Sequence, residues 1–169
     1  MKKVFFSAGM AALVLTACDK EDDNNKLNST DMEYIRMASI SNNAEIMAGQ
    51  LAASKGTAAM VKDFGSHMVM EHNTAQTDLK NRSSSAGMAV ADTVDAEHRA
   101  LMTYLSSLNG YSFDTAYINS QLKDHQKTID FFQMEINGGQ HQQIRSYAND
   151  YLPHIQMHYN KADSIRKAL

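Results

Sequence analysis

The chain has 169 residues, with 16 basic and 19 acidic side chains, seven histidines, twelve methionines and a single cysteine. This length suits one domain that can bury a sizeable core. The slightly negative net charge argues against nucleic acid as a partner, and a lone cysteine excludes an internal disulfide.

The N-terminus has the pattern of a bacterial lipoprotein leader. Lys2 and Lys3 precede an apolar run over residues 4–14 that is too short to span a bilayer comfortably, and small residues lead to Cys18. We therefore expect a signal peptide over residues 1–17 and membrane attachment through acyl chains, palmitate among them, on Cys18. The alternative is an ordinary secretory leader with a chance cysteine at its end.

Residues 18–29 are polar and mostly charged, which predicts a disordered acidic tether after the lipidated cysteine. The lysine and acidic residues after Cys18 resemble an export signal of surface lipoproteins in some Gram-negative bacteria. In enteric-type sorting, an aspartate in the position of Asp19 would instead mean inner-membrane retention. We favour the outer membrane, with the protein facing the periplasm or the cell surface. A spacer without a sorting role is the other interpretation.

Apolar side chains recur at three- and four-residue steps through the rest of the chain, as in amphipathic helices. Thr30 and Glu33 form a capping box that opens the first helix, and Gly56 ends it in a left-handed conformation. The helices are expected over residues 30–55, about 57–81, about 93–108 and 112–138, with a last long helix that includes residues 144–165.

Four of these helices are long and one is short, so we predict an all-α domain over residues 30–169. Their lengths suit an antiparallel, up-down four-helix bundle in which the short helix crosses between two helical hairpins. One long crossover of this kind is the connectivity of ferritin-like bundles.

Each long helix carries a polar residue on its otherwise apolar face. These residues are Glu45, His72, His125 and His158. Counting from the glycine turns places Glu45, His125 and the nearby His67 in the middle third of the bundle. Burying an unpaired polar group costs about 1–3 kcal/mol, so a purely structural protein has little use for them. Carboxylates and imidazoles that converge from several helices are ligands for iron, manganese or zinc.

Further polar residues lie beside these four and are candidates for additional ligands or for groups that orient the ligands. They are Glu71, Asp124, His67 and His154. The competing interpretation is that each histidine is a separate core residue satisfied by a neighbouring acid or a backbone carbonyl. Whether the polar residues form one cluster or two layers stays open, because a one-turn error moves a ligand by about 5.4 Å.

Methionines accompany the histidines in the segment from His67 to His72, and soft thioether ligands favour Cu(I). Methionine at helical spacing is more often a core residue, however, and Met68 already lies on the apolar stripe. Copper is therefore less favoured than iron, manganese or zinc.

Several short motifs occur in an order and spacing that resemble the bacterial family of domain of unknown function 4142. They are Met70-Glu71-His72 with Leu79, Phe113-Asp114 with Tyr117-Ile118, Asp124-His125, and Leu152-Pro153 with His158. The resemblance covers about residues 30–166. It implies a ferritin-like bundle in secreted or lipid-anchored envelope proteins, with the four central polar residues at recurrent polar positions, and it implies no settled activity.

The sequence lacks the helical Glu-x-x-His pairs of ferritin-type di-iron sites, a nucleophile elbow, a His-Glu-x-x-His zinc motif and a phosphate-binding glycine loop. An enzyme acting on peroxide or oxygen would need a redox-active metal that the sequence does not identify. We therefore favour a lipid-anchored envelope protein that binds a metal inside its bundle. The rival hypothesis is a non-catalytic structural or interaction lipoprotein of the outer membrane without a metal.

Overall fold

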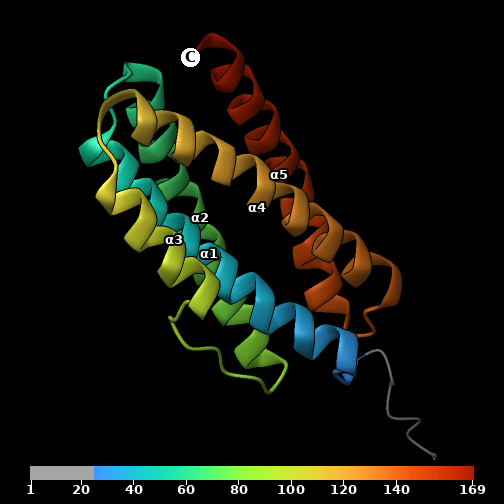
Figure 1. The fold of residues 1–169 in the computed structure, drawn as a ribbon. Coiled ribbons are helices and arrows are strands. Elements are labelled where there is room, and N and C mark those ends of the chain that lie inside the picture. Colours follow the sequence, from blue (N-terminus) through green and yellow to red (C-terminus); the bar gives the residue numbers. More distant parts are fainter. Residues whose placement is uncertain (1–24) are drawn as a thin grey trace, which may run out of the picture.

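The computed structural model describes residues 25–169, so the predicted leader and Cys18 lie outside the described residues. Five helices make up this part of the chain (Figure 1). They are α1 (Ser29–Lys55), α2 (Ala59–Ser85), α3 (Ala96–Ser107), α4 (Gly110–Gly138) and α5 (Gln142–Ala168). The all-α prediction is confirmed, as is the short helix between the second and third long ones. Within residues 25–169, no helix combines the length and apolar character needed to cross a membrane.

The four long helices pack as two hairpins. Helix α1 packs on α2, and α4 packs on α5; contacts of α1 with α4 and of α2 with α5 join the two pairs. The short α3 contacts α1 and α4 on the outside of the bundle (Figure 1). Leu105 of α3 belongs to the adjoining apolar core, and Leu101 and the C-cap residue Leu108 pack against that core, which accounts for the amphipathic pattern of this segment.

The start of α1 differs from the prediction. Its N-cap is Asn28, which exchanges capping hydrogen bonds with Asp31, so the predicted box of Thr30 and Glu33 does not form. Asn28 also donates to the carbonyl of Gly138 at 2.9 Å, and Leu27 packs against the core. The predicted tether therefore gives way to the bundle a few residues earlier than expected.

Each hairpin turn is capped by an aspartate from the other hairpin. Asp114 of α4 accepts hydrogen bonds from the backbone amides of Thr57 and Ala58, at 2.9 and 2.8 Å, at the start of α2. Asp31 of α1 likewise accepts from the amides of Gln140 and His141 at the start of α5. Neither α2 nor α5 has a capping side chain of its own, so these carboxylates supply the missing acceptors. The turns are thereby held at opposite ends of the bundle (Figure 1).

Two glycines let α1 and α2 approach closely. A Cβ atom on Gly49 would lie 2.7 Å from the carbonyl oxygen of Gly65, and one on Gly65 would lie 2.7 Å from that of Gly49. By contrast, Gly56 has a φ of −53°, so the predicted left-handed stop at the end of α1 is wrong. The turn there needs Gly56 for space, because a Cβ would lie 2.7 Å from the carbonyl oxygen of Ala52.

The apolar core falls into two clusters with a polar layer between them. One cluster includes Phe64, Met68 and Tyr117, and the other includes Tyr34, Leu79 and Tyr147. Along every long helix the chain passes from one cluster to the other through buried polar residues. These residues are Asn42 and Glu45 in α1, His72 in α2, His125 in α4 and His158 in α5. The question left open by the sequence is thereby answered, since the polar residues occupy one layer.

Candidate metal centre

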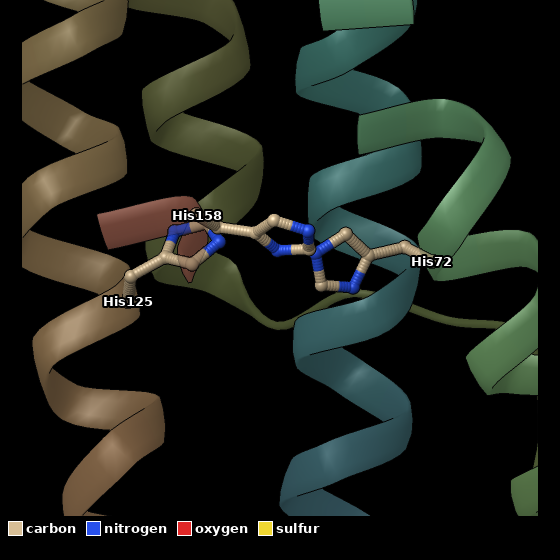
Figure 2. A group of neighbouring side chains, drawn as sticks. All are labelled: His72, His125 and His158. Atoms are coloured by element: carbon tan, nitrogen blue, oxygen red, sulfur yellow. The ribbon is translucent and has the colours of Figure 1, made fainter. Parts of the chain in front are cut away.

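Three histidines from three helices meet in the polar layer. The side chains of His72, His125 and His158 point toward one another into the space between α2, α4 and α5 (Figure 2). Their ring centroids are 5.4 Å apart for two of the pairs and 5.9 Å apart for His72 and His125. One ring nitrogen from each lies within 4.8 Å of the other two. All three residues are at most 2% exposed, so the group is almost completely shielded from bulk water.

On each of these rings one nitrogen has a defined hydrogen-bond acceptor. Nδ1 of His125 lies 2.9 Å from the backbone carbonyl of Gln121, and Nε2 of His158 lies 2.8 Å from Oε2 of Glu71. Nδ1 of His72 lies 3.0 Å from Oδ1 of Asn42. A carbonyl and a carboxylate can only accept, so those ring nitrogens carry the protons.

Asn42 orients His72 through its own hydrogen bonds. Its amide nitrogen donates to the hydroxyl of Tyr147 at 3.2 Å and to Oε1 of Gln76 at 3.3 Å. The amide oxygen is thereby turned to His72, whose Nδ1 must be the donor. Metal-binding histidines are held in this way, by a hydrogen bond from the nitrogen that does not bind the ion.

The remaining three ring nitrogens have no partner. Nε2 of His72, Nε2 of His125 and Nδ1 of His158 are buried and make no hydrogen bond. Burial lowers the pKa of His125 to about 3, and it lowers the pKa of His72 and His158 as well, even though Glu71 acts in the opposite direction on His158. At neutral pH the rings are therefore uncharged, and the unpartnered nitrogens present lone pairs, which is the form that binds a metal.

Glu45 lies in the same layer but on the far side of His125. Its Oε1 is 3.6 Å from Nδ1 of His125, the nitrogen that faces Gln121, and its carboxylate is not part of the converging group among the described residues. Burial, with the nearby Asp124 carboxylate, raises the pKa of Glu45 to about 8. The geometry therefore assigns Glu45 to the surroundings of His125, whereas the sequence predicted a ligand.

Glu71 is the best connected of the additional residues named from the sequence. Besides His158, it faces Nε2 of His67 at 3.2 Å and Nδ1 of His154 at 3.4 Å. Burial would raise the pKa of Glu71, but the hydrogen bond and charges of the surrounding histidines lower it overall. Glu71 is thus an ionised carboxylate at the outer edge of the triad, reaching it through His158.

The side chain of Asp124 does not belong to the histidine group. It lines a separate cavity of about 430 Å³, together with Asp95, Glu97 and His98, between α3 and α4. Burial raises the pKa of Asp124, and the charges of His98 and Lys127 oppose the shift. The structure therefore does not bring Asp124 to the triad, although it follows directly before His125 in the sequence.

Two functional residues escaped the sequence analysis. Neither Asn42 nor Gln121 was predicted from the sequence as a site residue. A polar residue on an apolar stripe was the available signal for Asn42. Gln121 contributes its backbone carbonyl, which every residue carries, so no side-chain pattern could identify it.

Comparison with known proteins adds to this description. No curated protein matches the sequence. The fold is similar to a crystal structure of a DUF305 fragment from Deinococcus radiodurans, with a TM-score of 0.70 and 9% sequence identity; the match covers 85% of this chain and 99% of that one. At this identity the similarity concerns the fold alone. The family profile of domain of unknown function 4142 (DUF4142) matches residues 16–165, and the chain therefore belongs to this family, as its sequence motifs predicted.

Proposed function

We propose that the protein binds one transition-metal ion through His72, His125 and His158. Two observations carry this proposal: one ring nitrogen of each histidine lies within 4.8 Å of the other two, and each ring has one buried nitrogen that makes no hydrogen bond. Leaving three such groups unpaired costs about 1–3 kcal/mol each, and a bound ion would remove that cost. A structural role alone gives no reason for the three rings to point toward one another (Figure 2).

The ligand chemistry favours zinc. Three neutral imidazoles suit zinc, iron or copper, whereas manganese prefers carboxylate and water oxygens. The three ligands of the triad are imidazoles, so the triad itself supplies none of the soft sulfur donors that favour Cu(I). Three histidines and one open position are a coordination set that zinc accepts at about 2.0–2.1 Å per nitrogen.

The proposal extends to the type of bundle. The long connection over residues 86–109, which contains α3, joins the two hairpins in the manner of ferritin-like folds. The ligands differ from those of ferritin-type di-iron centres, which use Glu-x-x-His pairs that this chain lacks. We therefore infer a ferritin-like scaffold with a mononuclear, histidine-based site.

We also propose that Cys18 is lipidated and that the bundle is carried on the outer membrane by a short tether. The leader pattern and the acidic segment after Cys18 support this location. Incorporation of labelled palmitate into the wild type, and its loss in Cys18→Ser, is the expected result. Equal labelling of both proteins would contradict lipidation at this residue.

Metal retention tests the central proposal. The purified protein is stripped with a chelator, offered Zn²⁺, Fe²⁺, Mn²⁺ and Cu²⁺ separately, and analysed for bound metal after desalting. We expect about one equivalent of Zn²⁺ in the wild type, and loss of this binding when His72 and His125 are both changed to alanine. His141→Ala is the matched control, because it removes a buried imidazole outside the layer.

Two results would contradict metal binding at the triad. One is the absence of retained metal in the wild type, together with a melting temperature that does not change with chelator. The other is unchanged retention in the double variant. The first result would favour the rival hypothesis, in which the buried polar residues specify packing in a structural or interaction lipoprotein.

A further inference from the structure

A second group of possible ligands adjoins the triad on its outer side. One ligand atom each from His67, Glu71 and His158 lies within 4.8 Å of the other two. His67 precedes Glu71 by one turn of α2, and its Nε2 faces Oε1 of that carboxylate at 3.2 Å. Oε2 of the same carboxylate faces Nε2 of His158 at 2.8 Å. The carboxylate is therefore held between an outer and an inner imidazole.

We propose that His67, Glu71 and His158 form an outer cation site through which a divalent transition-metal ion reaches the buried triad. This inference rests on the proposed function, since it describes how the triad is filled. The outer site is a transient one, and the triad is the place where the ion is retained.

The position of His158 carries the argument. Its Nε2 lies 2.8 Å from Oε2 of Glu71 in the outer group. Its Nδ1 is buried without a partner, and the ring points toward His72 and His125 (Figure 2). One imidazole thus borders both sites. In the metal-free protein its Nε2 carries the proton that is donated to Glu71, so His158 binds an outer ion in its other neutral tautomer, with the proton on Nδ1, and returns the proton to Nε2 when the ion moves inward. An ion bound outside is only one ring away from the inner position, so transfer requires side-chain rotation and no opening of the bundle.

The outer group also has the exposure and the charge that an entry site needs. The side chain of His67 is 41% exposed and that of Glu71 is 24% exposed, in contrast to 2% for His158. A carboxylate at this boundary attracts cations, and its oxygens with two imidazole nitrogens form a suitable ligand set. Exposure therefore decreases stepwise along the proposed route.

Cavities on both sides of His158 give access to this route. One cavity of about 360 Å³ is lined by His67 and His158, with Asp63 and Lys161 among its other residues. Another of about 240 Å³ is lined by Glu71, His72 and His158. The second cavity is lined both by Glu71 of the outer group and by His72 of the triad. The two ligand groups therefore share this cavity as well as the side chain of His158.

His154 provides a matched comparison for His67. It is 51% exposed, and its Nδ1 lies 3.4 Å from Oε2 of Glu71, so it touches the same carboxylate. It does not belong to a converging group of ligand atoms in the described chain. Loss of either histidine removes one half-exposed imidazole beside Glu71, but only the loss of His67 removes a proposed ligand.

The kinetics of metal uptake test the route. Co²⁺ is mixed with the metal-free protein at limiting concentration, and the visible absorption of the bound ion is followed in a stopped-flow instrument. If capture at the outer site precedes transfer, the rate of filling follows the affinity of that site. We expect His67→Ala to fill the triad about tenfold more slowly and to the same final extent, the typical scale for losing a group near a metal.

We expect His154→Ala to match the wild type in both rate and extent. Uptake by His67→Ala at the wild-type rate would overturn the proposal. Both variants alter half-exposed side chains, so this comparison does not depend on the stability of a variant with a changed core.

A titration separates the outer site from the triad. In the protein with His72 and His125 both changed to alanine, calorimetry with Zn²⁺ should detect one residual weak site, and adding His67→Ala should abolish it. Stoichiometric binding by the wild type with no residual site in the double variant would overturn the outer site and leave the triad standing. No binding by the wild type would instead contradict the proposed function itself.

Discussion

Nε2 of His158 donates a hydrogen bond to Oε2 of Glu71 at 2.8 Å, and this contact leaves Nδ1 as the nitrogen that faces the bundle interior. The carboxylate comes from α2 and the imidazole from α5, so the bond also ties the two hairpins together. The orientation of one metal-site ring is therefore set by a residue at the edge of the layer.

Glu71→Gln tests this relationship. A glutamine can still accept a hydrogen bond from Nε2 of His158, but it lacks the charge that makes the imidazole a stronger ligand. We expect about a tenfold loss of Zn²⁺ affinity, measured by competition with a chromophoric chelator. The control is Glu97→Gln, a surface carboxylate on α3 that pairs with Lys123 and Lys127. Equal affinities of the two variants would contradict the role of Glu71.

The metal-free protein is expected to lose stability in acid. Burial lowers the pKa of His125 from 6.5 to about 3, so below pH 6.5 the unfolded chain binds a proton that the native protein does not. The free energy of unfolding therefore falls as the pH falls from 6.5 toward 3, by up to about 1.4 kcal/mol per pH unit for each such group.

Urea unfolding of the metal-free protein between pH 7 and about 5 measures this dependence. His125→Gln removes one of the titrating groups, so its stability should vary less steeply with pH than that of the wild type. Parallel profiles for the two proteins would mean that His125 is protonated in the native state at these pH values.

The buried carboxyl of Glu135, beside Asp31, should make the free energy of unfolding fall as the pH rises, which is opposite to the effect of His125. Glu135 in α4 is fully buried, and burial together with Asp31 raises the pKa of Glu135 from 4.5 to about 8. The native protein keeps this proton up to about pH 8, whereas the unfolded chain loses it near 4.5. Its contribution to stability is therefore lost as the pH rises through this interval.

Glu135→Gln should remove that loss, because the amide is neutral at all these pH values. We expect the variant to exceed the wild type by about 1–2 kcal/mol in free energy of unfolding near pH 8.5 and to differ less near pH 5. Glu33→Gln changes an exposed carboxylate of α1 at the same end of the bundle and serves as the control. A constant difference between Glu135→Gln and the wild type at both pH values would contradict the raised pKa.

The contact between α1 and α2 depends on its glycines. Gly49→Ala would place a Cβ 2.7 Å from the backbone carbonyl oxygen of Gly65, so the helices must separate. We expect a loss of about 1–3 kcal/mol in free energy of unfolding. Gly138→Ala is the control, since its nearest neighbour is a Thr30 atom at 3.6 Å, and its effect should stay within about 1 kcal/mol. Equal stabilities of the two variants would contradict the close approach.

The three histidines of the triad could be identified from the sequence because helical periodicity puts each of them on an apolar face. Counting from the turns predicted polar residues in the middle third of the bundle, and the structure brings His72, His125 and His158 together in one layer. Both inferences use only the geometry of single helices and the lengths of the connections. For the same reason the five-helix architecture was predictable.

The surroundings of the triad were not predictable, because they depend on how the helices are rotated against each other. Glu71 and Asp124 each directly precede a triad histidine, yet Glu71 faces α5 and Asp124 faces a cavity beside α3. Glu45 shares the layer but meets the protonated side of His125. A sequence places a side chain on a helix face, and only the packing decides which neighbour that face meets.

Anomalous diffraction from crystals of the protein loaded with one equivalent of Zn²⁺ tests the account most directly, with data collected on both sides of the zinc absorption edge. The account predicts a single strong peak enclosed by His72, His125 and His158, about 2.0–2.1 Å from Nε2 of the first two and Nδ1 of the third. Zinc found only at surface residues, with the three nitrogens still unpartnered, would contradict it.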